Sequence, residues 1–468
     1  MISKCKKFSV FISLLLLVIS LPAQNKMIKY WLTNPDRSAL FQPQPGEVML
    51  KKQANDYPTV AVDDTQSYQG IDGFGFALTG GSALHIIKMT PAARKALLKE
   101  LFTTDKNNIG ISYLRLSIGA SDLNEKVFSY DDLPEGETDP MLKKFDLGPD
   151  RKDVIPVMKE ILALAPGIKI LGSPWSPPAW MKTIFDTRGG RLKPEFYGTY
   201  AAYFVRYIQA MKAAGINIDA ITVQNEPLHP GNNPSLLMPA PDEADFIKNH
   251  LGPAFQKAGI KTKIILYDHN ADRPDYPITI LNDPAAAKYI DGSGFHLYGG
   301  DIEALTDVHD AHPTKNLYFT EQMVVDRPGA KGIFIAGPVK RVMIGATRNW
   351  CRNVLLWNLA ADPEFKPFTD RGGCPSCQGA VTIDGDSVTR NLAYYVMAHA
   401  SKLVRPGSVR IASNNLDSVS TVAFKTPTGK KVLLAANNSK SEQTFNILYK
   451  GEMVTTQLKA GAVATYTW

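Results

Sequence analysis

The stretch "ITVQNEPLHP", from Ile221 to Pro230, raises the question that decides the fold. Its first four residues, Ile221–Gln224, have the composition of a buried strand, and Asn225, Glu226 and Pro227 follow at once. Asn and Pro are common where a strand gives way to a turn, so a plain strand-to-loop turn is one interpretation. The other is that Glu226 is held at the mouth of a barrel. The rest of the chain must decide between them.

Short apolar or β-branched runs alternate with longer helix-patterned stretches from about Gln69 to Ala400. Such alternation over about 330 residues is typical of a (β/α)8 barrel. A doubly wound sheet is the competing topology, but the glycines of "GFGFALTGG" do not have the spacing of a nucleotide-binding loop. The eight predicted strands cover residues 70–78, 111–119, 168–174, 220–226, 262–268, 292–298, 316–322 and 353–359.

The stretches between these strands carry helix start and stop signals. "MTPAARKALLKELF" offers Thr90 as an N-cap and Pro91 at the first helical position. The longer stretch 193–215 has aromatic residues on one face and ends at Gly215. The stretches 241–255 and 283–290 repeat the scheme, as expected for helices that alternate with the barrel strands.

The sequence patterns before and after this alternating region are different, with short strand-like stretches and no long helical ones. Beyond Ala400 the chain shows short alternating strands with turn residues at Thr428-Gly429 and 437–440, which is typical of a small antiparallel sandwich. Strand-like pieces also occur in 27–66. We therefore predict an α/β protein, a (β/α)8 TIM barrel with an appended antiparallel β-sandwich built from both chain termini. The predicted parts are 1–23 (signal peptide), 24–66 (N-terminal sandwich strands), 67–400 (catalytic barrel) and 401–468 (C-terminal sandwich).

The first residues have the pattern of a secretory signal peptide. A basic start with Lys4, Lys6 and Lys7 precedes a short apolar run at 8–20 and a small-residue cleavage site near Ala23. No other run is long enough to cross a bilayer, so we expect an exported protein without a membrane span, in the periplasm, at the cell surface or outside the cell. Loss of the three lysines lowers the formal charge from +7 to about +4. With no basic run left, nucleic acid is not an expected partner.

The cysteines point to an exported protein with one small disulfide. "GGCPSCQGA" places Cys374 and Cys377 in a Cys-x-x-Cys between glycines. A redox pair is one interpretation, but a structural loop staple is favoured because no thioredoxin-like unit surrounds the motif. A zinc site would need two more ligands, which the sequence does not offer at a suitable spacing. Cys351 is expected to be a reduced core residue. We expect no metal and no cofactor.

Polar and aromatic residues recur at the predicted strand ends. A TIM barrel builds its active site at the carboxyl ends of its strands, and aromatic faces with carboxylates and amides suit a sugar. Glu226 and Glu321 follow the fourth and seventh strands, nearly across the barrel, as the two carboxyl groups of glycoside hydrolysis require. Each residue taken alone could be a core or ion-pair residue. The strand-end set comprises Arg115, Asp122, Trp175, Trp180, Asn225, Glu226, Asp268, His296, Tyr298, Glu321, Trp357 and Asn358.

This combination resembles glycoside hydrolase family 30, the retaining barrel enzymes that include lysosomal glucosylceramidase and bacterial β-1,6-glucanases. The resemblance rests on "GFGFALTGG", "RLSIGASD", "SPWSPPAWMKT", "TVQNEP", "FHLY", "FTEQ" and "LLWNLA", in this order along the chain. It implies that Glu226 is the acid/base and Glu321 the nucleophile. It also implies that Asp122, Trp175, Asn225, His296, Tyr298 and Trp357 line the subsite of the cleaved sugar. Arg115 is expected to keep Glu321 ionised and Tyr298 to hydrogen-bond it.

A retaining mechanism makes two structural predictions. The carboxyl groups should lie about 5–5.5 Å apart, and the pKa of Glu226 should be raised to about 6 because it starts protonated beside a negative Glu321. The resemblance to the family implies an endo-β-1,6-glucanase acting on β-glucan, and we expect a monomer. An exo-acting β-glucosidase or glucosylceramidase-like enzyme, a family 30 xylanase and a non-catalytic glycan-binding barrel are the alternatives. The long stretch after Glu226 could wall a pocket or line a groove.

Overall fold

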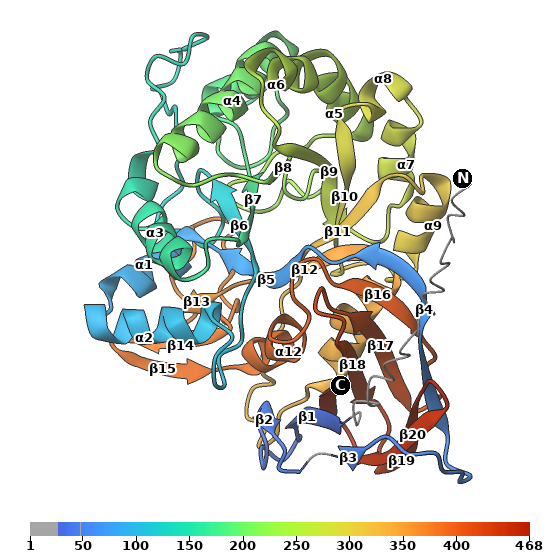
Figure 1. Cartoon of the computed structure of the whole chain (residues 1–468). Coiled ribbons are helices and arrows are strands. Elements are labelled where there is room, and N and C mark those ends of the chain that lie inside the picture. The colour runs from blue at the N-terminus through green and yellow to red at the C-terminus, as the bar shows by residue number, and fades with distance from the viewer. Residues whose placement is uncertain (1–26, 47) are drawn as a thin grey trace, which may run out of the picture.

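The computed structural model describes residues 27–46 and 48–468, in which a closed barrel lies beside a β-sandwich (Figure 1). The predicted signal peptide, residues 1–23, lies outside the described residues. Within the described part of the chain, no helix combines the length and the apolar character needed to cross a membrane. The predicted fold class, a TIM barrel with an appended sandwich, is confirmed.

The barrel consists of parallel strands in sequence order, and the last strand closes on the first. Each predicted strand is present. The fourth is much shorter than predicted, because only Ala220–Thr222 pairs regularly. The barrel strands are β5 (Gly73–Leu78), β6 (Tyr113–Ile118), β7 (Lys169–Pro174), β8 (Ala220–Thr222), β9 (Lys263–Asn270), β10 (Ile290–His296), β11 (Asn316–Glu321) and β12 (Cys351–Leu356).

Helices surround the barrel, and their ends follow the local sequence. Thr90 caps α2 by accepting a hydrogen bond from the Ala93 N–H, and Pro91 opens that helix, as predicted. The predicted helix at 241–255 is continuous but passes through a π-helical turn at Ile247–Leu251. The larger helices are α1 (Gly80–Lys88), α2 (Pro91–Phe102), α3 (Val154–Leu164), α4 (Tyr197–Ala213), α5 (Ala240–Phe246), α6 (Gly252–Ala258), α7 (Asp275–Leu281), α9 (Ala304–Ala311) and α12 (Leu392–Ser401), and the short α8 (Pro284–Ala287) precedes β10. Short helical segments α10 (Ala336–Pro338), η5 (Val339–Ile344) and α11 (Gly345–Arg348) precede β12, and single turns η1, η2 and η3 span Gly148–Arg151, Ala179–Met181 and Pro194–Phe196.

The barrel interior changes from apolar to polar along the strands. A buried apolar cluster at the amino-terminal end includes Tyr113, Leu171, Ala220, Tyr318 and Leu355. Side chains of a strand alternate between its two faces, so the residue two positions later again points inward. On these strands the next inward residues are Arg115, Ser173, Thr222, Thr320 and Trp357. The strands therefore bring a polar layer to their carboxyl ends.

The sandwich contains strands from both ends of the chain. β1 (Met27–Thr33) pairs antiparallel with β21 (Val463–Thr467), and β4 (Thr59–Gly70) lies between β16 (Val409–Ser413) and β19 (Gln443–Tyr449). The same sheet contains β2 (Gln42–Pro43), β3 (Val48–Met49), β17 (Val419–Lys425), β18 (Lys431–Asn437) and β20 (Glu452–Leu458). The N-terminal strands thus complete a sheet that the C-terminal strands continue.

A buried histidine connects the barrel with the sandwich. His399, on α12, has its Nε2 2.8 Å from Thr33 Oγ1 on β1 and its Nδ1 2.9 Å from Thr465 Oγ1 on β21. The Phe41 ring contacts the imidazole edge-on at 5.0 Å. Burial lowers the pKa of His399 to about 3, so the ring is neutral at ordinary pH.

A small sheet that the sequence did not predict follows β12. It consists of β13 (Ala360–Ala361), β14 (Val381–Asp384) and β15 (Ser387–Arg390). The segment between β13 and β14, residues 362–380, contains the Cys-x-x-Cys motif. Cys374 and Cys377 form a disulfide, and Cys351 is a buried free cysteine, as the favoured interpretation predicted.

Candidate active site

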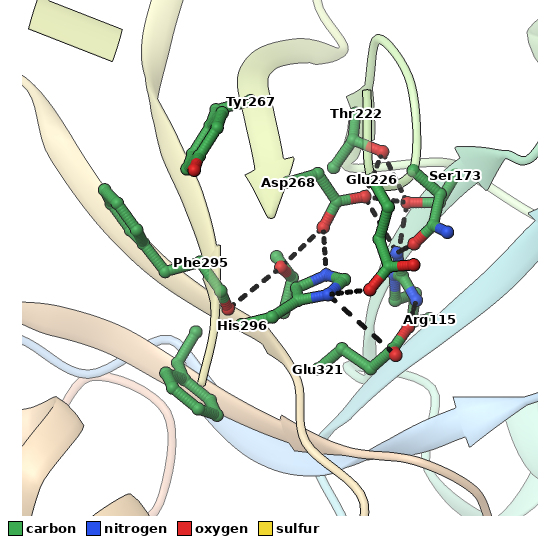
Figure 2. Close-up of polar contacts among 12 residues, drawn as sticks. Arg115, Ser173, Thr222, Glu226, Tyr267, Asp268, Phe295, His296 and Glu321 are labelled. Atoms are coloured by element: carbon green, nitrogen blue, oxygen red, sulfur yellow. Dashed lines mark hydrogen bonds and ion pairs between the residues drawn. The ribbon is translucent and has the colours of Figure 1, made fainter. Parts of the chain in front are cut away.

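Arg115, on β6, lies at the centre of a buried polar cluster at the carboxyl ends of the strands (Figure 2). Its Nη1 donates to Glu321 Oε2 at 2.5 Å, and its Nη2 donates to Asp268 Oδ2 at 2.8 Å and Asn225 Oδ1 at 2.7 Å. The guanidinium also lies 4.8 Å from the centre of the Trp175 ring. The rigid guanidinium fork thus fixes side chains from four other strand ends relative to one another.

Asp268, at the end of β9, is a second centre of the cluster. Its Oδ1 accepts hydrogen bonds from Thr320 Oγ1 at 2.5 Å and lies 3.1 Å from His296 Nε2, while Thr222 Oγ1 donates to its Oδ2 at 2.7 Å. Burial raises the pKa of Asp268, but the charge of Arg115 and the hydrogen bond of His296 outweigh it and hold the pKa well below its usual range. Asp268 is therefore a permanent anion.

The backbone around Glu226 answers the question raised by its sequence. Its φ is +47°, and its N–H donates to the carbonyl of Asp268 at 3.0 Å, while the N–H of Asn225 donates to the carbonyl of Pro174 at 2.8 Å. The chain at the end of β8 is thus tied to β9 on one side and to β7 on the other. This left-handed conformation is unusual for a residue with a side chain. It keeps Glu226 at the mouth of the barrel, so the plain-turn interpretation is excluded.

Two glutamates face each other across this cluster. An oxygen of Glu226, an oxygen of Glu321 and a ring nitrogen of His296 all lie within 4.8 Å of one another. Glu321 Oε1 accepts a hydrogen bond from the Tyr298 hydroxyl at 3.0 Å, and Asn232 Nδ2 donates to Glu226 Oε2 at 3.1 Å. Both carboxyl groups are largely buried. Two facing carboxyl groups at this separation can attack and protonate opposite sides of one bond.

A pocket of about 290 Å³ opens above the two glutamates. The predicted residues Asp122, Trp175, Asn225, Tyr298 and Trp357 line it. Arg115 and His296 do not; both are buried beneath it and contact the glutamates. The complete lining is Asp122, Trp175, Asn225, Glu226, His229, Asn232, His269, Asn270, Tyr298, Glu321, Met323, Trp357, Cys374 and Cys377.

Family comparisons agree with this geometry. Residues 71–404 match the glycosyl hydrolase family 30 TIM-barrel domain, and residues 407–466 match the glycosyl hydrolase family 30 beta sandwich domain. The chain belongs to glycosyl hydrolase family 30. It is therefore a glycoside hydrolase, as the resemblance of its motifs predicted.

Individual family 30 relatives cover most of the chain. An endo-1,6-beta-D-glucanase of Neurospora crassa is 34% identical over 432 residues, which cover 86% of this chain and 88% of the relative. The lysosomal acid glucosylceramidase of Mus musculus is 29% identical, with 82% of this chain and 78% of the relative covered. A solved endo-beta1,6-glucanase superposes with a TM-score of 0.87 at 33% identity, covering 94% of this chain and 99% of that chain.

The charges in this family 30 site differ from two expectations. Burial raises the pKa of Glu226, but the hydrogen bond and charge of His296 outweigh burial and leave it below its ordinary value. The prediction that this pKa is raised to about 6 is therefore wrong for the site without substrate. A second expectation, that Arg115 keeps Glu321 ionised, is also wrong for the site without substrate: burial raises the pKa of Glu321 above its ordinary value, against the opposing charges of His296 and Arg115.

His296 explains much of this pattern. Burial lowers its pKa, but the charge of Glu321 and the hydrogen bonds with Asp268 and Glu226 raise it to about 9. Its Nδ1 lies 3.3 Å from Glu226 Oε1 and its Nε2 3.1 Å from Asp268 Oδ1, so both ring nitrogens face carboxylates. Only the protonated ring can donate from both nitrogens. His296 is therefore a cation beneath the pocket.

Several residues of the site were not singled out from the sequence. Asp268 was noted at a strand end without a role, and His229, Asn232, His269, Asn270 and Met323 were not noted. Two noted residues lie elsewhere: Trp180 donates from Nε1 to the carbonyl of Asp131 at 2.9 Å, and Asn358 donates to the carbonyl of Cys377 at 3.3 Å. "YDHNAD" was a usable signal, because its polar residues directly follow a predicted strand.

Proposed function

We propose that this chain is an endo-acting β-1,6-glucanase that cleaves β-glucan with retention of anomeric configuration. The observation that carries the proposal is the pair of facing carboxyl groups, Glu226 and Glu321, with oxygens within 4.8 Å of one another. Retaining glycosidases have carboxyl groups about 5–5.5 Å apart, whereas inverting enzymes need about 6.5–9.5 Å to admit a water molecule. The β-1,6 linkage is supported by the endo-1,6-beta-D-glucanase relative, which is similar over 86% of this chain.

Glu321 is the nucleophile in this proposal. Arg115 at 2.5 Å from Oε2 and the Tyr298 hydroxyl at 3.0 Å from Oε1 orient the carboxylate and favour its ionised form. The carboxylate attacks the anomeric carbon, and the bond from that carbon to the leaving oxygen breaks. The product of this step is a glycosyl-enzyme ester.

Glu226 is the acid/base. It gives its proton to the leaving oxygen in the first step and takes a proton from the attacking water in the second, so the configuration is retained. The hydrogen bonds with His296 and Asn232 favour the ionised form that the second step needs. The first step needs Glu226 protonated and Glu321 ionised, the reverse of what the pKa directions favour in the site without substrate, so the proposal requires the bound sugar to move the proton to Glu226.

The pocket residues hold the cleaved sugar. Trp175 and Trp357, with ring centres 5.4 Å apart, offer apolar faces, and Asp122 and Tyr298 offer polar groups. Asn225 Oδ1 already accepts from Arg115, which leaves Nδ2 to donate to the sugar 2-hydroxyl. Arg115 and His296 act through the glutamates and are positioning residues.

The proposed reaction uses no cofactor or metal. Glu226, His296 and Glu321 have donor atoms close enough for a metal ion. A protonated His296 cannot be a ligand, however, and Arg115 already occupies Glu321 Oε2.

We also propose that the chain acts outside the cytoplasm as a monomer. N-terminal sequencing of the exported protein would check the location, and light scattering would check the oligomeric state.

The product profile on linear β-1,6-glucan, sampled early, tests the substrate and the mode of cleavage. An endo-glucanase gives a ladder of oligosaccharides and turns over an aryl β-glucoside slowly. Glucose alone, with brisk aryl glucoside cleavage, would instead establish an exo-acting β-glucosidase. The small pocket of about 290 Å³ favours that second candidate. If neither substrate is cleaved, the substrate assignment fails.

A further inference from the structure

The Cys374–Cys377 disulfide lies in the wall of the candidate active site. Both cysteines line the pocket of about 290 Å³ together with Trp175, Trp357 and Met323. Cys377 is 4% exposed and belongs to a buried cluster with both tryptophans, and its Sγ lies 3.4 Å from the Met323 sulfur. The motif is therefore part of the sugar-binding pocket as well as a staple.

The disulfide belongs to a segment that crosses between the loops of the barrel mouth. We call residues 362–380, between β13 and β14, the strap. The Thr369 N–H donates to the carbonyl of Asp122 at 2.9 Å, and Asn233 Nδ2 donates to the carbonyl of Asp370 at 3.0 Å. These bonds tie the strap to the loops that follow β6 and β8.

Further contacts fix the same segment on either side of the disulfide. Arg371 forms an ion pair with Asp186 at 3.0 Å, in the loop after β7. Gln378 Oε1 accepts from the Asp326 N–H at 2.9 Å, in the loop after β11. The strap is thus attached to four loops of the barrel mouth, and the disulfide closes its tightest turn.

The glycines that precede Cys374 let the strap approach these loops closely. A Cβ on Gly373 would lie 3.0 Å from the carbonyl oxygen of Asp122, and one on Gly372 would lie 2.7 Å from that of Gly231. The φ of Gly372 is +153°, which residues with a side chain rarely adopt. "GGCPSC" is therefore built to place the two sulfurs at one position above the barrel.

We propose that the Cys374–Cys377 disulfide is a substrate-binding part of the sugar-binding pocket, holding the strap as an apolar wall against the cleaved sugar. The disulfide adds sulfur to the indole faces of Trp175 and Trp357, and the rest of the lining includes the polar residues His229, Asn232, His269 and Asn270. Such a surface suits the apolar face of a pyranose. This inference rests on the proposed function, because it names the part of the pocket that binds the glucosyl unit.

The apolar wall contributes to sugar binding, whereas residues of the barrel strands position the two reacting carboxyl groups. Glu226 and Glu321 are positioned by Arg115, His296 and Tyr298, which come from β6 and the β10 end. Opening the disulfide therefore weakens sugar binding while the reacting carboxyl groups keep their places. The expected signature is a raised KM with little change in kcat.

The test compares a Cys374→Ser, Cys377→Ser double variant with the wild type on β-1,6-gluco-oligosaccharides and on an aryl β-glucoside. KM rises about tenfold on both substrates and kcat changes less than about twofold, since uniform binding is lost. Ser376→Ala is the matched control, because Ser376 lies in the same turn, is exposed and does not line the pocket. It should keep the wild-type KM.

Reduction of the folded wild type makes the same test without a substitution. A dithiol such as dithiothreitol converts the disulfide into two thiols and is itself oxidised to a cyclic disulfide. The wild-type KM then rises, reoxidation restores it, and the double variant does not respond. An unchanged KM after complete reduction, checked by thiol labelling, would overturn the proposal. A fall in kcat by as large a factor as the rise in KM would also overturn it. A wild type that cleaves neither substrate would instead refute the proposed function.

Discussion

The Arg115 guanidinium donates to Glu321 Oε2 at 2.5 Å, and neither side chain is more than 8% exposed. Arg115 also neutralises Asp268, which has no solvent-exposed side-chain surface. Removing one partner of a buried ion pair leaves an uncompensated buried charge. This lowers the free energy of unfolding by more than a surface ion pair contributes to it. The stability of this site therefore depends on the same cation as its proposed chemistry.

Arg115→Ala should lower the free energy of unfolding by about 3–5 kcal/mol and abolish activity, because Asp268 and Glu321 lose their shared cation. Arg115→Lys keeps a charge but not the planar fork, so it should be more stable than Arg115→Ala and still lose about 10²-fold in kcat. Arg273→Ala, at an exposed pair with Asp275, is the control. Thermal unfolding and kinetics check both effects. A wild-type melting temperature for Arg115→Ala would contradict this account.

Glu226→Gln and Glu321→Gln should fail at different steps. Loss of the acid/base lowers kcat about 10²–10⁴-fold on glucan, but an aryl glucoside with a good leaving group still forms the glycosyl-enzyme. Azide should then rescue Glu226→Gln and give the glucosyl azide with retained configuration. Glu321→Gln lacks the nucleophile and should lose turnover, on the order of 10⁴-fold, while it still binds oligosaccharide. If azide instead gave the retained glucosyl azide with Glu321→Gln and not with Glu226→Gln, Glu321 would be the acid/base and Glu226 the nucleophile.

Asn232→Ala should move the alkaline limb of the kcat/KM profile to higher pH. The first step needs protonated Glu226, so kcat/KM falls as pH rises through the pKa of that carboxyl group. Asn232 donates to Glu226 Oε2 at 3.1 Å and so favours the ionised form. Its removal should raise the pKa and shift the limb by about half a pH unit. The exposed Asn249 provides a matched Asn→Ala control, and an unshifted limb would exclude this role.

His399→Gln should make the stability of the protein less sensitive to acid. Burial holds the pKa of His399 at about 3, below its ordinary value of 6.5, so the unfolded chain binds more protons between these values. The stability contributed by the neutral ring is present above pH 6.5 and is lost as pH falls, at about 1.4 kcal/mol per pH unit. As pH is lowered from 7 to 4, the melting temperature should fall more steeply for the wild type than for His399→Gln. Parallel curves for the two proteins would contradict the assignment.

The alternation of strands and helices predicts the barrel, but regular alternation cannot predict its irregular strand ends. On β9, Ile265 points into the barrel, and a strict period of two would place Tyr267 inside. Tyr267 and Asp268 both have a positive φ, and the pairing with β10 shifts there, so Asp268 joins the inner polar layer instead. Backbone conformations of this kind are imposed by tertiary contacts, which a single sequence does not display.

The strap was beyond prediction for a related reason. Its residues lack helical or strand periodicity. Its position depends on contacts with loops that lie far away in the sequence, through residues such as Asp186 and Asn233. Its glycines and cysteines were visible as a tight, stapled turn. Only the fold shows that this turn meets the pocket. Loop residues such as Asn232 were missed because polar loop residues look alike in sequence whether or not they face a substrate.

The pairing of β1 with β21 also governs the order in which this molecule can be completed. Lys29 is opposite Thr467 and Thr33 is opposite Val463, so the neighbour of β1 is synthesised only after the whole barrel. Until that neighbour arrives, β1 presents an open edge of the kind that recruits other chains. A chain shortened by its last strand would therefore carry an aggregation hazard at its opposite end.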